Sequence, residues 1–203
     1  MTASRQPETL RLFVAVELPP EAVDALGRLL DGLHAADLHG LRPVMPNGIH
    51  LTLKFLGDVK VAQAPDLTAT LDGIGPQAVP FTVELGDIGG FPDLGSPRVL
   101  WVGLAGDLEP LSALARLVDS AVAELGFRRE TRPFNPHLTV ARMRDSASGE
   151  DRRGAGAAFA ALPWDGGAPI PIDSFRLIKS TLTPEGPIYE TLRQVALSSP
   201  TPA

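Results

Sequence analysis

The chain of 203 residues contains no cysteine, which excludes disulfides, thiolate metal sites and a cysteine nucleophile. It also has no apolar run of the roughly 18 residues that a membrane span needs. Residues 1–8 lack the basic and then apolar order of a signal peptide. We therefore expect a cytoplasmic protein without a membrane anchor, long enough to bury a core without covalent cross-links.

An excess of positive charge is absent as well. The formal net charge is −6, which argues against a protein that grips long nucleic acids mainly by neutralising phosphates. The charge is uneven, because residues 128–153 hold seven arginines against four acidic residues, a net charge of +3. This stretch is either a solvated loop or a surface that steers a small anionic substrate.

One short pattern occurs twice, as His50-Leu51-Thr52 and as His137-Leu138-Thr139. A histidine is followed by Leu-Thr by chance on the order of one time in a hundred or less, so two cases among four histidines are informative. Both copies lie in short aliphatic runs that predict strands, and strand alternation places each histidine and its threonine on one face. Leu51, Leu53 and Phe55 are expected on the opposite face, toward a core.

Three side chains beside the motifs are further candidates. Lys54 has the parity of His50, so we expect it on the histidine face. Phe55 is expected to pack in the core, unless it lies at the mouth of a cleft under a base. Arg142 follows His137 by five residues, and in a regular strand it reaches the site only if the strand bends or ends nearby.

The rest of the chain predicts an α+β fold with mostly antiparallel sheets, about seven strands and four helices. We expect strands over residues 10–18, 49–57, 81–88, 98–104, 137–142, 172–181 and 188–197. We expect helices over residues 22–33, 59–74 and 107–125, the last with Asp107 as its N-cap, and a short alanine-rich helix ending at Leu162. Residues 41–48 are expected to be a connection, residues 146–156 a mobile loop, and the termini outside residues 9–197 disordered.

Two histidines on one site suit a particular chemistry. Imidazole, with an ordinary pKa of roughly 6.5, both accepts and donates protons near neutrality. One ring can deprotonate an attacking water or hydroxyl while the other protonates the leaving oxygen. This division of work fits an in-line displacement at the phosphorus of a diester. The hydroxyls of Thr52 and Thr139 would donate hydrogen bonds to the non-bridging oxygens, and the scheme needs no metal ion.

The segments HLTLKFLG and NPHLTVAR, with RLFVAVELP near the start and GPIYETL near the end, resemble one known family. They are similar to the two-histidine phosphoesterases, specifically the bacterial RNA 2',3'-cyclic phosphodiesterases, also called 2'-5' RNA ligases. The resemblance extends over residues 11–192. It implies one bilobal domain over residues 1–203, with two mostly antiparallel sheets related by a pseudo-two-fold axis around a central cleft and helices on the outside.

The resemblance also implies an activity: hydrolysis of 2',3'-cyclic phosphate ends of RNA to 2'-phosphates, without metal or cofactor. A reversible 2'-5' joining of tRNA halves, in which a 5'-hydroxyl replaces water, is implied as well. The expected partners are RNA ends, as tRNA halves or short oligonucleotides, and cyclic nucleotides. No membrane and no obligatory protein partner is expected, and the protein is expected to be a monomer.

The roles that the resemblance implies can be stated residue by residue. His137 is the base that activates water and His50 is the acid that protonates the 3' leaving oxygen, although the sequence pattern itself leaves this order open. Thr52, Thr139 and Arg142 bind the phosphate. The possible further substrate contacts are Lys54, Phe55 and Arg132.

Other interpretations remain open. A single strand histidine is more often a hydrogen-bonded core residue, but repetition with the same threonine offset favours a catalytic pair. Zinc normally needs three or four protein ligands, and no carboxylate or third histidine has a ligand-like spacing to either motif. A non-catalytic RNA-end or nucleotide-binding protein would not require both imidazoles. An enzyme acting on ADP-ribose 1'',2''-cyclic phosphate or on 2'-5' oligoadenylate would have the same pattern.

Overall fold

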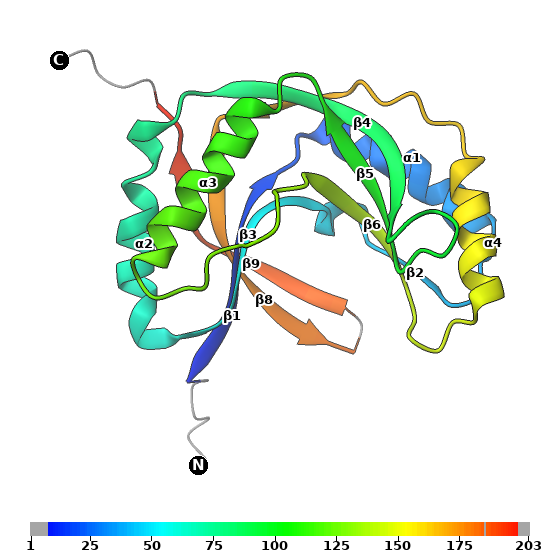
Figure 1. The fold of residues 1–203 in the computed structure, drawn as a ribbon, viewed down its shortest axis with the longest axis horizontal. Helices are drawn as coiled ribbons and strands as arrows, with labels where there is room; N and C mark the ends of the chain where they lie inside the picture. Colours follow the sequence, from blue (N-terminus) through cyan, green and yellow to red (C-terminus); the bar gives the residue numbers. More distant parts are fainter. Residues whose placement is uncertain (1–7, 185, 199–203) are drawn as a thin grey trace.

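Two antiparallel sheets form the body of the protein in the computed structural model, which describes residues 8–184 and 186–198 (Figure 1). The first sheet has the order β3-β1-β8-β9: β3 His50–Lys60, β1 Thr9–Glu17, β8 Ser174–Thr183 and β9 Gly186–Ala196. The second has the order β2-β6-β5-β4-β7: β2 Leu41–Pro43, β6 His137–Met143, β5 Val99–Ala105, β4 Phe81–Phe91 and β7 Pro169–Ile172. The predicted α+β class with antiparallel sheets is confirmed.

Four α-helices lie on the outside of the sheets within the described residues: α1 Pro20–Ala35, α2 Ala64–Asp72, α3 Glu109–Ala123 and α4 Gly149–Ala160 (Figure 1). Short 3-10 turns are η1 Pro46–Gly48, η2 Val61–Gln63 and η3 Gly75–Gln77. Helices α1 and α3 follow the apolar periodicity of the sequence, and each buries one face. Among the described residues, no helix combines the length and apolarity needed to cross a membrane.

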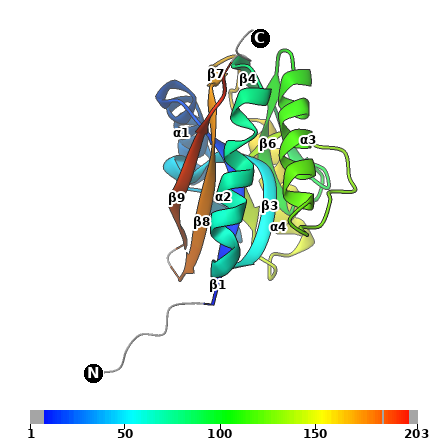
Figure 2. The same ribbon diagram turned by 90° about the vertical axis from the view of Figure 1, so that its left-hand side faces the viewer.

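The helices cover the two sheets from different ends of the molecule. Helices α2 and α3 lie side by side in both views, and α3 packs against β3 (Figures 1 and 2). Helix α1 contacts β2 and β7 of the second sheet, and α4 contacts β4. One large cluster of buried side chains runs through both sheets and includes the motif leucines Leu51 and Leu138. This shared core supports the prediction of a single domain, which we propose on that ground; one cooperative unfolding transition would test it.

Several predicted elements need correction. Residues 41–48 are not only a connection, since β2 pairs with β6, and the short strand β7 lies on the edge beside β4. Residues 146–156 are mostly the helix α4 rather than a loop, because Ser148 and Asp151 form a capping box that starts it. The N-cap of α3 is Leu108, although Asp107 still accepts a hydrogen bond from a backbone N–H of the first turn. The predicted disorder of the termini concerns residues outside the described ones, apart from Glu8 and Ser198.

Candidate active site

The two motif strands repeat one another in burial as well as in sequence. The first six residues of β3 and of β6 follow the same order: half-buried, buried, half-buried, buried, buried, exposed. Each histidine ring is oriented by a carbonyl two residues earlier: His50 Nδ1 lies 2.9 Å from Gly48 O, and His137 Nδ1 lies 2.8 Å from Asn135 O. A carbonyl accepts only, so each Nδ1 carries the proton. Nε2 of each ring is therefore left to accept or donate a proton.

Both strands also carry a β-bulge at the same place. Opposite β1, Ala15 pairs with Thr52 and Val14 with Lys54, so Leu53 is the extra residue. Opposite β5, the pairing skips Val140 between Thr139 and Ala141. The extra residue is thus the third after the histidine in both strands. A bulge reverses the alternation of side chains beyond it, so the fifth residue after each histidine returns to the histidine face.

In β3 this reversal exchanges the expected positions of Lys54 and Phe55. Phe55, expected in the core, is 67% exposed, and its ring centroid lies 6.1 Å from that of Phe13, whose ring stacks on His50 at 4.6 Å. Lys54, expected on the histidine face, is buried at 8% exposure on the other side of the sheet. The prediction assumed that β3 is a regular strand. This was wrong, because β3 pairs with β1 only with the bulge at Leu53. The strand also continues past Gly57 to Lys60, since Gly57 (φ 72°) takes up a second register shift.

In β6 the same reversal brings Arg142 onto the face of His137 and Thr139. Arg142 is exposed and follows two buried residues. Its guanidinium forms no ion pair with the described residues. The condition set for Arg142, that the strand must depart from regularity, is met by the bulge at Val140. The positive charge of Arg142 is therefore available to an anion.

The electrostatics of His50 link the two strands. Burial lowers the pKa of His50 below its usual value; the hydrogen bond to Gly48 opposes this effect, and the charge of Arg142 lowers the pKa further. Burial raises the pKa of the Tyr189 phenol, which the charges of Arg142 and Arg11 partly offset. The charge of Arg142 in β6 thus acts on His50 of β3 and on Tyr189 of β9, and β3 and β6 contact one another.

Each histidine also packs against aromatic rings that sequence reasoning did not assign. His50 stacks on Phe13 and meets the ring of Tyr189 edge-on with centroids 5.0 Å apart, and these two aromatic rings also contact one another. His137 meets the ring of Phe91 edge-on at 4.9 Å. Tyr189 and Phe13 lie in the segments GPIYETL and RLFVAVELP, so the resemblance marked both segments without giving their contacts. No sequence signal pointed to Phe91.

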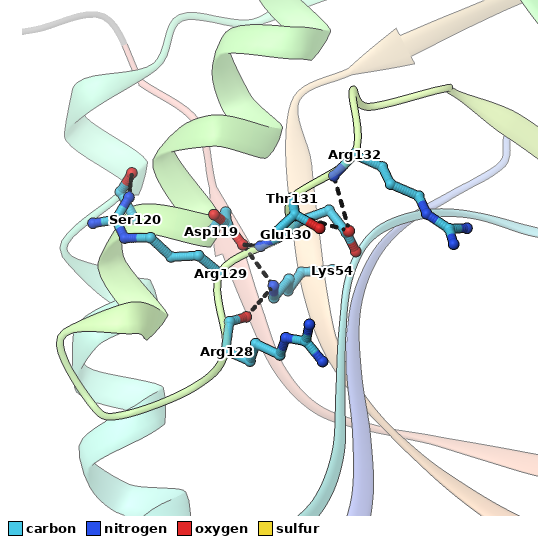
Figure 3. A network of polar contacts seen from close by, with 8 residues as sticks. All are labelled: Lys54, Asp119, Ser120, Arg128, Arg129, Glu130, Thr131 and Arg132. Atoms are coloured by element: carbon cyan, nitrogen blue, oxygen red, sulfur yellow. Dashed lines mark hydrogen bonds and ion pairs between the residues drawn. The ribbon is translucent and has the colours of Figure 1, made fainter.

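Lys54 is part of a polar network behind the site (Figure 3). Its Nζ donates to Asp119 Oδ1 of α3 at 2.5 Å and to Arg128 O at 2.7 Å. Arg132, a predicted substrate contact, lies exposed on the same loop, and its backbone N–H donates to Glu130 Oε1 at 3.2 Å. Lys54 is therefore not available as a substrate contact, because both its position and its hydrogen bonds direct it to α3.

Other candidate features lie elsewhere in the molecule. His34 is exposed near the end of α1, and His39 is also exposed, with its Nδ1 3.2 Å from Asp151 Oδ1. In residues 8–184 and 186–198 no group of three or more His, Asp or Glu side chains could hold a metal ion. The cavities of about 490 Å³ beside α1 and about 270 Å³ beside Trp164 are lined by neither motif.

An α+β protein in which each of two antiparallel sheets contains one His-x-Thr strand has the architecture of the two-histidine phosphoesterases. The family model described as LigT like phosphoesterase matches residues 16–101 and 102–189. The chain therefore belongs to the LigT like phosphoesterase family.

Named relatives and solved structures agree with this assignment. An RNA 2',3'-cyclic phosphodiesterase of Archaeoglobus fulgidus is 35% identical over 91% of this chain and 98% of its own length. One of Thermus thermophilus is 34% identical over 93% of this chain and 90% of its own. A crystal structure of a Thermus thermophilus protein superposes with a TM-score of 0.76 at 30% identity, covering 94% of this chain and 99% of that one. Escherichia coli LigT complexed with 3'-AMP gives 0.71 at 27% identity, covering 95% and 100%.

Proposed function

We propose that this protein is an enzyme that hydrolyses 2',3'-cyclic phosphate ends of RNA to 2'-phosphates, using His50 and His137 as acid and base and no metal ion. The observation that carries the proposal is the matched geometry of the two rings. Each Nδ1 is held by a carbonyl, so each Nε2 is left for proton transfer. Family membership and the names of the relatives support the substrate class.

In the proposed reaction His137 Nε2 takes a proton from water, and the water oxygen attacks phosphorus. The bond between phosphorus and the 3' oxygen breaks, and His50 donates its proton to that oxygen, which leaves a 2'-phosphate and a free 3'-hydroxyl. Solvent then returns both rings to their starting protonation. A lowered pKa makes protonated His50 a stronger acid, which suits proton donation to a leaving group. If a 5'-hydroxyl replaces water as the nucleophile, the same displacement joins two RNA ends by a 2'-5' bond and frees the 3'-hydroxyl, and the reverse reaction cleaves that bond.

The remaining groups on the histidine face are proposed to bind the substrate. Arg142 and the hydroxyls of Thr52 and Thr139 would hold the non-bridging oxygens and stabilise the charge that grows on them in the transition state. Phe55, exposed beside Phe13, would stack under the base. A pure binding protein would need the arginine and the aromatic ring, but it would not need two imidazoles held in the same way.

The decisive experiment is product analysis of an oligonucleotide ending in a 2',3'-cyclic phosphate, incubated in EDTA. The expected product is the 2'-phosphate with a free 3'-hydroxyl. It is identified by ³¹P NMR and by treatment with phosphatases that distinguish a 2'-phosphate from a 3'-phosphate. A 3'-phosphate product, an unchanged substrate or a strict need for added metal ions would refute the proposal. Location in the cytoplasm and a monomeric state are part of the same proposal, and cell fractionation and light scattering test them.

A further inference from the structure

The loop that leads from α3 into β6 is fixed at its backbone although it has no regular secondary structure. Lys54 Nζ donates to Arg128 O, and the backbone N–H of Glu130 donates to Asp119 Oδ1 at 3.0 Å. The Glu130 carboxylate accepts the backbone N–H groups of Thr131, at 3.0 Å, and of Arg132. Buried Lys54 and the helix residue Asp119 thus hold residues 128–132 against the first motif strand (Figure 3).

The contacts that anchor the loop occupy the acidic groups of the loop and of the neighbouring helix. The side chains of two arginines of the loop take no part in these contacts. Asp119 is paired with Lys54, and Glu130 is occupied by backbone N–H groups. Arg128 and Arg132 are exposed, and neither forms an ion pair with the described residues. A fixed backbone that presents unpaired guanidinium groups is suited to bind phosphates, because little order is lost on binding.

The direction of the side chains separates these arginines from their neighbour. Figure 3 shows Arg128 and Arg132 leaving the loop on the side away from α3, whereas Arg129 runs back along α3. There Arg129 Nη1 lies 3.4 Å from Ser120 Oγ, and Nη2 lies 4.0 Å from Glu124 Oε1. The loop is tied to β3 at Lys54, four residues after His50, and it leads directly to His137, so the two outward arginines belong to the segment that joins the two motif strands.

We infer that Arg128 and Arg132 bind backbone phosphates of the nucleotides that precede the cyclic phosphate, so that the enzyme prefers the end of an RNA strand to a cyclic mononucleotide. The inference rests on the proposed function and adds the residues that select the length of the substrate. Lys54 and Asp119 act as positioning residues, because they set the loop and touch no part of the RNA themselves. The basic stretch of the sequence thereby receives a specific part in recognition.

The test compares uridine 2',3'-cyclic phosphate with oligouridylates of two to six nucleotides that end in the same group. For the unchanged protein, kcat/KM should rise with length and then level off. The double variant Arg128→Gln/Arg132→Gln should lower the ratio of oligonucleotide to mononucleotide kcat/KM by about tenfold. The slope of the logarithm of oligonucleotide affinity against the logarithm of salt concentration should become shallower by about 1.4. This is roughly 0.7 for each of the two lost phosphate contacts on a single strand. Arg129→Gln, in the same loop, is the matched control and should leave the ratio unchanged.

Asp119→Asn tests the positioning role. Displaced arginines would raise KM for the oligonucleotide, whereas partial unfolding would lower kcat and leave KM where it was. An equal kcat/KM for all lengths in the unchanged protein, or an equal loss on both substrates in the double variant, would overturn the inference.

Failure of the proposed function gives a different result, with no hydrolysis of either substrate. In that case fluorescence anisotropy with an oligouridylate ending in a 2'-phosphate still tests the arginines. Weaker binding in Arg128→Gln/Arg132→Gln than in Arg129→Gln supports the inference, and equal binding overturns it.

Discussion

Strands β3 and β6 are built on the same plan but carry different side chains. Both present a histidine held by a carbonyl two residues earlier, a threonine on the same face, and a bulge one residue after the threonine. Beyond the bulge β3 presents Phe55 to the site, whereas β6 presents Arg142. The comparison teaches that one backbone irregularity, used twice, can place an aromatic ring on one side of a site and a positive charge on the other.

The surroundings of the two histidines also differ. His50 is covered by Phe13 and Tyr189, whereas His137 meets the edge of Phe91. Burial and the charge of Arg142 lower the pKa of His50. These surroundings disfavour the charged form of His50, which suits a residue that must give up its proton.

The largest effect should come from removing either member of the pair. His50→Ala and His137→Ala should each lower kcat/KM on a cyclic mononucleotide by at least about 10²-fold, because each ring supplies one proton transfer. The double variant should be little worse than either single one, since the two act together. His34→Ala serves as the control in the same EDTA-containing assay, and full activity in either motif variant would break the comparison.

The next largest effect should come from Arg142, the fifth residue after His137 in β6. Arg142→Gln should lower kcat by about 10-fold to 10²-fold, because its hydrogen bonds to the phosphate strengthen as charge develops. Steady-state kinetics separates kcat from KM, and Arg144→Gln, one residue past the end of the same strand, is the matched control. A change in KM alone would mean that Arg142 binds the ground state and the transition state equally well.

The aromatic ring of Phe55, the fifth residue after His50 in β3, should contribute to substrate binding instead. Phe55→Ala should raise KM by about tenfold with kcat nearly unchanged, the value expected for loss of one stacked base. Phe55→Tyr should retain the original KM. A ribose 2',3'-cyclic phosphate without a base should show no difference between Phe55 and alanine; a difference there would assign the ring to the phosphate site or to folding.

The fourth residue after each histidine allows a test of what stabilises the two strands. In β3 this residue is the buried Lys54, whereas in β6 it is the small buried Ala141. Lys54→Met should lower the free energy of unfolding by about 1–2 kcal/mol, because Asp119 Oδ1 and Arg128 O lose the hydrogen bonds from the Lys54 ammonium. Urea denaturation measures this change, and exposed Lys60→Met at the end of the same strand should have little effect. Equal midpoints for the two variants would contradict the network.

The smallest effect should be on the pH profile. If His50 must be protonated as the acid, kcat/KM falls on the alkaline side as His50 loses its proton, and the lowered pKa places this limb below roughly 6.5. Tyr189→Ala exposes the His50 ring, which relieves the burial that lowers its pKa, and should move the limb to higher pH. If Tyr189→Ala instead shifts the fall of kcat/KM on the acid side, His50 is the base. NMR titration of the His50 ring should show the same upward change in its pKa.

Helices α1 and α3 and most of the long strands were predicted from the sequence, because apolar periodicity reflects which face each element buries. The second part of helix α4 was predicted as a short helix ending at Leu162, but its first part was mistaken for a loop, although the Ser148–Asp151 spacing is a local capping signal. The short strands β2 and β7 had no such signal. A three- or four-residue strand is defined by the neighbour that it pairs with.

The sequence alone determined the chemistry available to this protein, because two His-x-Thr patterns in strand-forming runs specify both the residue types and the face that they share. Only the tertiary structure decided which later residues join them. A bulge exists relative to a partner strand, so the positions of Phe55, Lys54 and Arg142 depended on the register with β1 and β5. The covering of His50 by Tyr189 likewise required strands distant in the sequence to meet, which local patterns do not encode.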